Sequence, residues 1–371
     1  MPSCSTRWWR PALRWTWRML VALSMALASL WGVMALWYQL PAPMAVVVAV
    51  MAGWGLLGLA AALATLRLFL VRRYRRRLSG LWLIAAMVLL VWWQTITPRG
   101  DRDWADDVAR LPRAEVQGDR VTIDNVRHFE WQTPDHYIER WETRTYNLSE
   151  LVSTDLIVSY WMGPAIAHTL VSFGFEDGRQ LVFSVEIRRQ RGEAFSAVGG
   201  FFKQFELALI AADERDIVRT RSNVRGESVY LYRVALPKDD ARQLFLAYLD
   251  QADALRRAPA FYNTLTSNCT TLVFDMVKRI IPGLPSNYRL LLSGYLPGYL
   301  YDLGALDTSR PLVELKSRGA INSRALAADN WGHAAPGFSA MIRNGVPAPD
   351  GHLLGGEGTQ APVGASPEHS H

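Results

Sequence analysis

Residues 261–274 read Phe261-Tyr262-Asn263-Thr264-Leu265-Thr266-Ser267-Asn268-Cys269-Thr270-Thr271-Leu272-Val273-Phe274. This stretch joins a polar loop to an apolar run, and a cysteine lies at the junction. Ser267 or Asn268 is a suitable N-cap, so we expect Cys269 in the first turn of a helix that ends at Pro282-Gly283. A helix N-terminus can lower a thiol pKa from ~8.5 into the ~3.5–7.5 range, which produces a nucleophilic thiolate. A buried structural cysteine is the alternative interpretation.

Residues 167–188 are typical of a β-hairpin. Residues 167–175 and 180–188 alternate between apolar and polar side chains, and Glu176-Asp177-Gly178 between them has turn composition. A three-residue loop with Gly178 in the left-handed conformation puts the apolar side chains of both strands on one face. This register sets His168 opposite Glu186. The same polar face carries the small residues Ser172, Gly174 and Ser184.

The cysteine and the hairpin together supply the residue types of a thiol enzyme. A nucleophilic cysteine needs a nearby base and a group that orients the base. We expect His168 to be the base, Glu186 or Asn268 to fix its imidazole, and the N–H of Cys269 to help hold an oxyanion. The residues expected to support the site or the oxyanion are Asn268, Thr270, Ser184 and Tyr262. Each member also has a structural interpretation: a strand histidine can bond a backbone carbonyl, and a strand carboxylate can pair with a neighbouring arginine.

The N-terminal part of the chain is strongly apolar. Three runs, at about 19–40, 44–66 and 81–96, are predicted to cross a membrane. Arginines gather before the first run and in a loop expected over residues 71–80, which predicts that the N-terminus and this loop are cytoplasmic and places residues after 97 outside. A cleaved signal peptide is the alternative for the first run, and two spans instead of three would leave the large domain in the cytoplasm.

Composition agrees with a membrane protein. The 371 residues carry a net charge of +6 and are 50% apolar. Because the basic clusters flank apolar runs, they indicate membrane topology, and we expect no nucleic-acid partner. The two cysteines, Cys4 and Cys269, would lie on opposite sides of the membrane and could not pair. A lone Cys269 thiol in an oxidising compartment favours a catalytic role.

The chain is predicted to have five parts. They are a membrane anchor (1–97), a charged linker (98–118), a periplasmic catalytic domain (119–306), a C-terminal extension (307–345) and a disordered tail (346–371) whose composition is rich in Gly, Pro, Ala and Ser. Inside the domain we expect short strands at 121–125 and 129–131, a helix over 194–212, a loop or edge strand over 215–223, a strand over 227–236, and a helix from Asp239 or Asp240 to Leu255.

Cofactor chemistry has little support in the sequence. No His, Cys or carboxylate pair shows zinc-ligand spacing around the cysteine. Gly199-Gly200 does not follow a strand in the pattern of a phosphate loop, so nucleotide binding is not expected. We therefore expect neither a metal nor another cofactor.

Several stretches recur, in order, in a known family: residues 167–175, 183–188, 212–216, 262–263 with 268–270, and 296–301. On these residues, the part from about Tyr146 to Thr308 resembles the periplasmic domain family named after the Lnb-type lipoprotein N-acyltransferases. The resemblance implies a papain-like α+β fold related to circularly permuted NlpC/P60 enzymes, in which histidine precedes cysteine. His168 and Cys269 follow that order. In the named relatives the membrane helices follow the domain, whereas here they precede it.

The resemblance further implies transfer of an acyl chain onto, or within, the N-terminal cysteine of a lipoprotein. The expectation is a multi-pass protein of the bacterial inner membrane whose periplasmic domain transfers acyl groups through a Cys269 thioester. Its partners would be membrane lipid or lipoprotein. The alternatives are a cysteine peptidase or amidase that acts on cell-wall peptide, and a membrane-anchored binding domain without catalysis.

Overall fold

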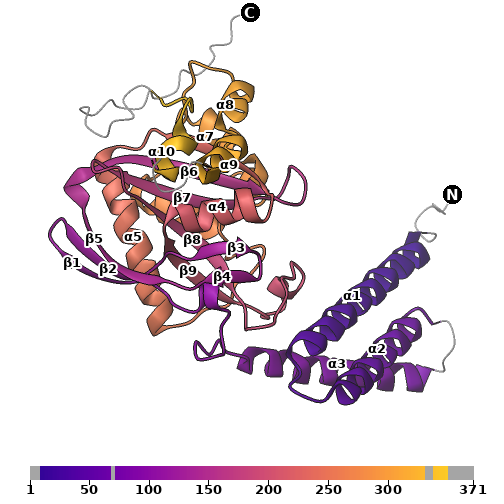
Figure 1. Cartoon of the computed structure of the whole chain (residues 1–371). Helices are drawn as coiled ribbons and strands as arrows, with labels where there is room; N and C mark the ends of the chain where they lie inside the picture. The colour runs from indigo at the N-terminus through magenta and orange to yellow at the C-terminus, as the bar shows by residue number, and fades with distance from the viewer. Residues whose placement is uncertain (1–8, 68–71, 331–336, 350–371) are drawn as a thin grey trace, which may run out of the picture. The chain divides into compact units, whose positions relative to one another are not determined.

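The computed structural model describes residues 9–67, 72–330 and 337–349 (Figure 1). It comprises two compact units. The first contains residues 1–102, 192–206 and 259–264, and the second contains residues 103–191, 207–258 and 265–371. The predicted class is confirmed, because a mixed α+β part with a large sheet follows three long apolar helices.

The first unit contains α1 (Trp9–Gln39), α2 (Met44–Thr65) and α3 (Arg72–Thr95), each with a segment long and apolar enough to cross a membrane. The three predicted runs lie within these helices or end within two residues of them. One difference concerns the basic stretch before the third run, which we predicted as a loop. It forms the beginning of α3, because arginine is a good helix former and continues the helix.

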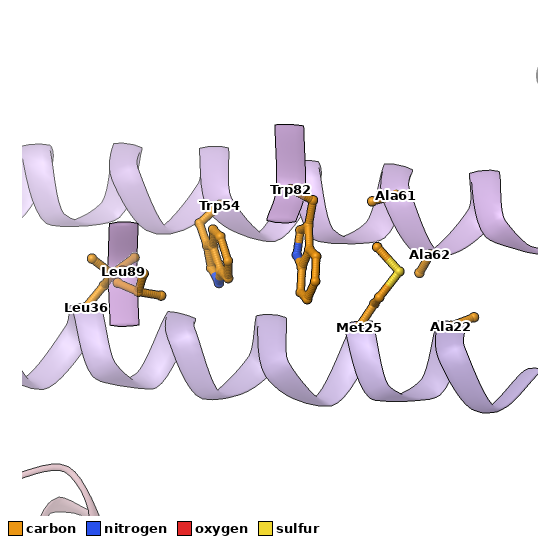
Figure 2. Packing of buried hydrophobic residues seen from close by; sticks show 8 residues of the cluster. All are labelled: Ala22, Met25, Leu36, Trp54, Ala61, Ala62, Trp82 and Leu89. Atoms are coloured by element: carbon orange, nitrogen blue, oxygen red, sulfur yellow. The ribbon is translucent and has the colours of Figure 1, made fainter. Parts of the chain in front are cut away.

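A buried polar centre joins the three helices, and Figure 2 shows the buried hydrophobic side chains that pack around it. The indole Nε1 of Trp54 donates to the carbonyl of Ser29 at 2.8 Å, and that of Trp82 donates to Ser29 Oγ at 3.0 Å. Close approach at this centre depends on Gly58, where a Cβ would lie 2.1 Å from Ser29 Oγ. The buried cluster around it consists of Ala22, Met25, Leu36, Trp54, Ala61, Ala62, Trp82 and Leu89.

The predicted helix over residues 194–212 is wrong. This stretch holds a loop with the short 3-10 helix η3 (Gly199–Phe201) and then strand β9 (Glu206–Ala212). Every residue of β9 is buried, because the strand lies between β2 and β8 in the sheet. A strand buried on both faces is continuously apolar and has no alternation, so its sequence is compatible with a buried helix.

The second unit is built on a sheet with the order β1-β2-β9-β8-β7-β6-β10, in which β5 also pairs with β2. Its strands are β1 (Arg113–Gln117), β2 (Arg120–Arg127), β5 (Trp141–Asn147), β6 (Leu151–Tyr160), β7 (His168–Phe175), β8 (Gln180–Arg188), β9 and β10 (Ser228–Val234), while β3 (Glu130–Thr133) and β4 (His136–Ile138) form a separate pair. The predicted strands near 121–125, 129–131 and 227–236 correspond to β2, β3 and β10.

The helices of this unit are α4 (Glu214–Arg219), α5 (Lys238–Arg257), α6 (Thr271–Ile280), α7 (Leu296–Asp302), α8 (Leu312–Gly319), α9 (Asn322–Asn330) and α10 (Phe338–Arg343). Helix α5 begins after Pro237, so Asp239 and Asp240 lie in its first turn and are not its N-cap. The helix crosses one face of the sheet (Figure 1), where its Phe245 and Tyr248 rings pack against Phe173 and Phe183 of the hairpin.

The hairpin has the predicted register. Leu170 pairs with Ser184 and Val171 with Phe183, and Gly178 has φ +82° in the turn. The face opposite α5 is polar. Ser172 there donates to Glu214 of α4, which also accepts from Arg343 of α10.

Residues 215–223, predicted as a loop or edge strand, instead form most of α4 and of the adjoining π-helix η4 (Thr220–Val224). Three carboxylates fix this helical segment. Asp213 accepts from Arg144, Glu214 accepts from Ser172 and Arg343, and Asp216 pairs with Arg127. These contacts, which no local pattern encodes, stabilise a helix where the sequence alone looked irregular.

The segment predicted as a linker, 98–118, contains the 3-10 helix η1 (Asp106–Val108) and strand β1. The predicted extension, 307–345, contains α8, α9 and α10. Of the predicted disordered tail, residues 350–371 lie outside the described residues, as does Cys4.

Candidate functional site

The start of β7 and the end of β8 bring the predicted base and its partner together. Nε2 of His168 lies 2.7 Å from Oγ of Ser184 and 3.1 Å from Oε1 of Glu186. The Ser184 hydroxyl donates to the same Glu186 oxygen at 2.7 Å. Since that hydroxyl donates to the carboxylate, its lone pair is available to an Nε2–H of His168. The carboxylate and the hydroxyl therefore hold one side of the imidazole.

Cys269 lies two residues before Thr271, where α6 begins, and not in the first turn of the helix as predicted. Asn268 nevertheless makes the predicted capping contacts, because its Oδ1 accepts from the N–H groups of Thr270 at 2.9 Å and Thr271 at 3.0 Å. From β7, the hydroxyl of Thr169 donates to the carbonyl of Cys269 at 3.1 Å. The cysteine is thus held on one side by the helix start and on the other by the strand that carries His168.

The charges in this cluster favour an ionised pair. Burial raises the pKa of the Cys269 thiol, but the charge and hydrogen bond of His168, together with Thr169, lower it to about 7. Burial and the charge of Arg221 lower the pKa of His168, while the charges of Glu186 and Cys269 raise it to about 9. The charge of each group thus favours the ionised form of the other.

The carboxylate of Glu186 stays ionised although its side chain is only 17% exposed. Burial raises its pKa, but the charges of His168 and Arg221 hold the pKa of Glu186 well below its usual range. Its negative charge is thus available at neutral pH to stabilise a protonated His168.

Sequence reasoning missed Arg221. Its Nη2 donates to Oε1 of Glu186 at 2.9 Å, and its Nη1 donates to Glu227 at 3.4 Å. Glu227 also accepts from the hydroxyl of Ser159. Arg221 belongs to η4, and the contacts that place η4 come from distant parts of the chain. No signal in residues 215–223 distinguishes Arg221 from the arginines beside it.

Two other residues, Thr270 and Tyr262, were predicted to support the site, and they belong to different units of the structure. Oγ1 of Thr270 lies 4.0 Å from the sulfur of Cys269. Tyr262 belongs to the first unit, where its N–H donates to the carbonyl of Phe205 at 3.0 Å. Across the ranges that the structure describes, no group of three or more His, Cys, Asp or Glu side chains could hold a metal ion.

These features define an α+β domain with a Cys269–His168–Glu186 cluster, in which the cysteine and the histidine are buried, in a chain that also carries three apolar helices. Residues 137–294 match the family model of the Lnb N-terminal periplasmic domain, and the match includes all three residues of the cluster. No curated protein and no solved structure matches the chain. The matched domain and the apolar helices indicate a membrane-associated protein with a periplasmic domain.

Proposed function

We propose that this protein is a periplasmic cysteine acyltransferase anchored in the bacterial inner membrane. The observation that carries the proposal is the buried cluster in which Glu186 lies 3.1 Å from His168 while His168 lowers the pKa of the Cys269 thiol to about 7. Perturbed titration in a group of nucleophile, base and orienting carboxylate is characteristic of catalytic sites.

Each residue has one role. Cys269 is the nucleophile and His168 is the base. Nε2 of His168 is occupied by Ser184 and Glu186, so Nδ1 is the nitrogen that exchanges a proton with the thiol. The N–H of Cys269 holds the oxyanion, because the N–H groups of Thr270 and Thr271 donate to Asn268.

The reaction runs in two halves. The Cys269 thiolate attacks the carbonyl carbon of an acyl ester, the ester C–O bond breaks, and the imidazolium gives its proton to the departing alcohol oxygen. This leaves an acyl thioester and a neutral imidazole. An acceptor amine then attacks the thioester carbonyl and gives its proton to His168. The C–S bond breaks, and the products are an amide and the restored thiolate–imidazolium pair.

The membrane anchor favours a lipid or lipoprotein substrate. The arginines at the start of α3 and in the N-terminal stretch support a cytoplasmic N-terminus, and three spans then deliver the domain to the periplasm. A domain tethered to the membrane by these helices would meet acyl donors there. A peptidase or amidase would use the same residues, but water would accept the acyl group from Cys269 in place of an amine.

Alkylation of Cys269 by iodoacetamide in membranes tests the thiolate–imidazolium pair. Cys4→Ser leaves Cys269 as the single thiol, and the rate is measured against pH with and without His168→Ala. His136→Ala, at an exposed histidine of β4, is the matched control. We expect fast labelling at neutral pH that slows at least tenfold in His168→Ala and is unchanged in His136→Ala.

A second measurement separates transfer from hydrolysis. Incubation with membrane phospholipid should leave an acyl group on Cys269, detected as a mass increase that hydroxylamine removes.

Two kinds of result would contradict the proposal. In the alkylation experiment, an ordinary thiol pKa that is unaffected by His168→Ala, or labelling only after denaturation, would identify a structural cysteine. Acyl-enzyme that passes its acyl group to water and never to an amine would identify a hydrolase.

A further inference from the structure

The segment 195–202 is attached to the ends of two apolar helices within the first unit. The ring of Phe202 stacks on Tyr38 of α1 with centroids 5.6 Å apart and meets Trp93 of α3 edge-on at 6.4 Å. The side-chain amide of Gln39, the last residue of α1, donates to the carbonyl of Phe202 at 2.7 Å. These contacts fix the segment beside the C-terminal ends of α1 and α3.

Lys203 strengthens this attachment. Its ammonium donates to the carbonyls of Trp93 at 2.8 Å and Ile96 at 3.1 Å, which lie at the C-terminal end of α3. It also lies over the Trp93 ring at 4.8 Å. Cations are favourable at helix C-termini, and Trp and Tyr gather where a spanning helix leaves the hydrocarbon. The segment is therefore held at the level of a membrane–water interface.

The side chains that this segment exposes are apolar. Val198 is 46% exposed and Phe201 is 45% exposed, and Phe195 is exposed as well. The apolar helices to which the segment is attached expose side chains of the same kind, such as Ile84 and Val91 of α3. In a spanning arrangement those helix residues face lipid, so the apolar side chains of the segment continue the lipid-facing surface at its edge.

We propose that residues 195–202 form a membrane-inserted loop whose apolar side chains enter the outer leaflet of the bilayer. The partner is the acyl-chain and headgroup boundary of a phospholipid membrane. The inference rests on the spanning topology in the proposed function and adds a second membrane contact that lies far from the helices in the sequence.

The same loop is bonded to the stretch that leads into Cys269. The hydroxyl of Thr264 donates to the carbonyl of Ala197 at 2.9 Å, and the N–H of Tyr262 donates to Phe205 at 3.0 Å. Gly200 permits this close approach, because a Cβ there would lie 2.3 Å from Oγ1 of Thr264. The proposed membrane loop is thus bonded to Thr264, which precedes Cys269 by five residues in the chain.

Depth-dependent fluorescence quenching tests the loop. In a Cys4→Ser/Cys269→Ser background, Val198→Cys and Phe201→Cys are labelled with NBD, and the full chain is reconstituted into phosphatidylcholine–phosphatidylglycerol vesicles. Ile84→Cys on α3 is the reference for a lipid-facing position. Val116→Cys on β1 is the matched aqueous control, because Val116 is 48% exposed.

We expect lipids that carry a nitroxide on the acyl chain to quench NBD at positions 198 and 201 at least threefold more than at position 116. Equal quenching at 198, 201 and 116, with strong quenching at 84, would overturn the loop and leave the topology intact. Absence of quenching at 84 would overturn the spanning topology and the loop with it. Since none of these variants needs activity, the outcome is independent of whether Cys269 is catalytic.

Discussion

Arg221 and His168 approach the same oxygen of Glu186. Nη2 of Arg221 donates to Oε1 at 2.9 Å, and Nε2 of His168 lies 3.1 Å from that atom. Nη1 of Arg221 donates to the carboxylate of Glu227. The guanidinium thus separates two carboxylates in a site that is largely buried, and it lowers the pKa of His168 while Glu186 raises it.

Arg221→Gln should destabilise the domain by about 3 kcal/mol, because removing one partner of a buried ion pair leaves its carboxylates uncompensated. Chemical denaturation of the purified protein in detergent, followed by tryptophan fluorescence, measures the loss. Arg242→Gln is the control, since Arg242 pairs with Asp119 at the surface and should cost no more than ~0.5 kcal/mol. Equal effects of the two substitutions would show that the Arg221 contacts contribute no more than a surface pair.

Glu186→Gln should raise the thiol pKa of Cys269. The carboxylate raises the pKa of His168, and the imidazolium charge in turn lowers that of Cys269. We expect the alkylation curve to move to higher pH by at least one unit and acyl transfer to fall ~100-fold. Glu176→Gln, in the exposed turn of the same hairpin, should change neither. An unchanged curve and intact activity in Glu186→Gln would indicate that Asn268 orients the histidine.

The pH dependence of the intact protein follows from the same pair. The thiolate forms as pH rises through about 7, the pKa of Cys269, so the alkylation rate should increase through that value. The imidazolium is lost as pH rises through about 9, the pKa of His168. Acyl transfer needs the imidazolium proton for the leaving alcohol, so its rate should fall above that value while alkylation stays fast. Parallel profiles of the two reactions would contradict this assignment of roles.

The parts of the site that the sequence could predict are those fixed by local chemistry. The register that brings His168 near Glu186 follows from alternation in two strands and from Gly178 in the turn between them. The capping oxygen of Asn268 is similarly a short-range feature that three residues determine. Both predictions rested on residues that are close together in the chain, 167–188 for the hairpin and 268–271 for the cap, so tertiary context had little opportunity to override them.

The parts that the sequence could not predict depend on distant contacts. Arg221 reaches Glu186 only because α4 is fixed by side chains from β2, β5, β7 and α10. The sequence of strand β9 does not alternate between apolar and polar residues, because the strand is buried on both faces. Its continuous apolar run is equally compatible with a buried helix. Likewise, the attachment of residues 195–202 to α1 and α3 joins positions more than 100 residues apart, as in the bond between Gln39 and Phe202.

Asp216→Asn should destabilise the domain and displace η4. The Asp216 carboxylate accepts from the guanidinium of Arg127 at 2.8 Å and from the indole of Trp131 at 2.8 Å, in a fully buried position. The loss of its charge leaves Arg127 unpaired, so we expect a cost of about 3 kcal/mol. Denaturation in detergent measures it. Asp253→Asn, at an exposed pair on α5, is the matched control and should cost no more than ~0.5 kcal/mol.

If α4 positions Arg221, Asp216→Asn should also alter the chemistry of a site that Asp216 does not touch. Alkylation of Cys269 should show a shifted pH curve under conditions where the variant is still folded. A destabilised variant with an unchanged curve would separate the stability of α4 from the placement of Arg221.

The packing of the apolar helices gives a prediction that is independent of catalysis. A Cβ at Gly58 of α2 would lie 2.1 Å from Oγ of Ser29, the residue that also accepts from the indoles of Trp54 and Trp82. Gly58→Val should therefore push α2 away from α1 and break this buried polar centre. Close helix approach at small residues is a main source of helix association in membranes.

Gly53→Val is the matched control on the same helix, because a Cβ at Gly53 would have no atom within 4 Å apart from the neighbouring backbone of its own helix. Thermal unfolding in detergent should give a melting temperature at least 5 °C lower for Gly58→Val than for Gly53→Val, which should resemble the unsubstituted protein. Equal melting temperatures would mean that α1 and α2 do not pack through Ser29 and Gly58. A loss in both variants would instead indicate that Gly53 also packs closely against another element, since Val costs little at a lipid-facing position.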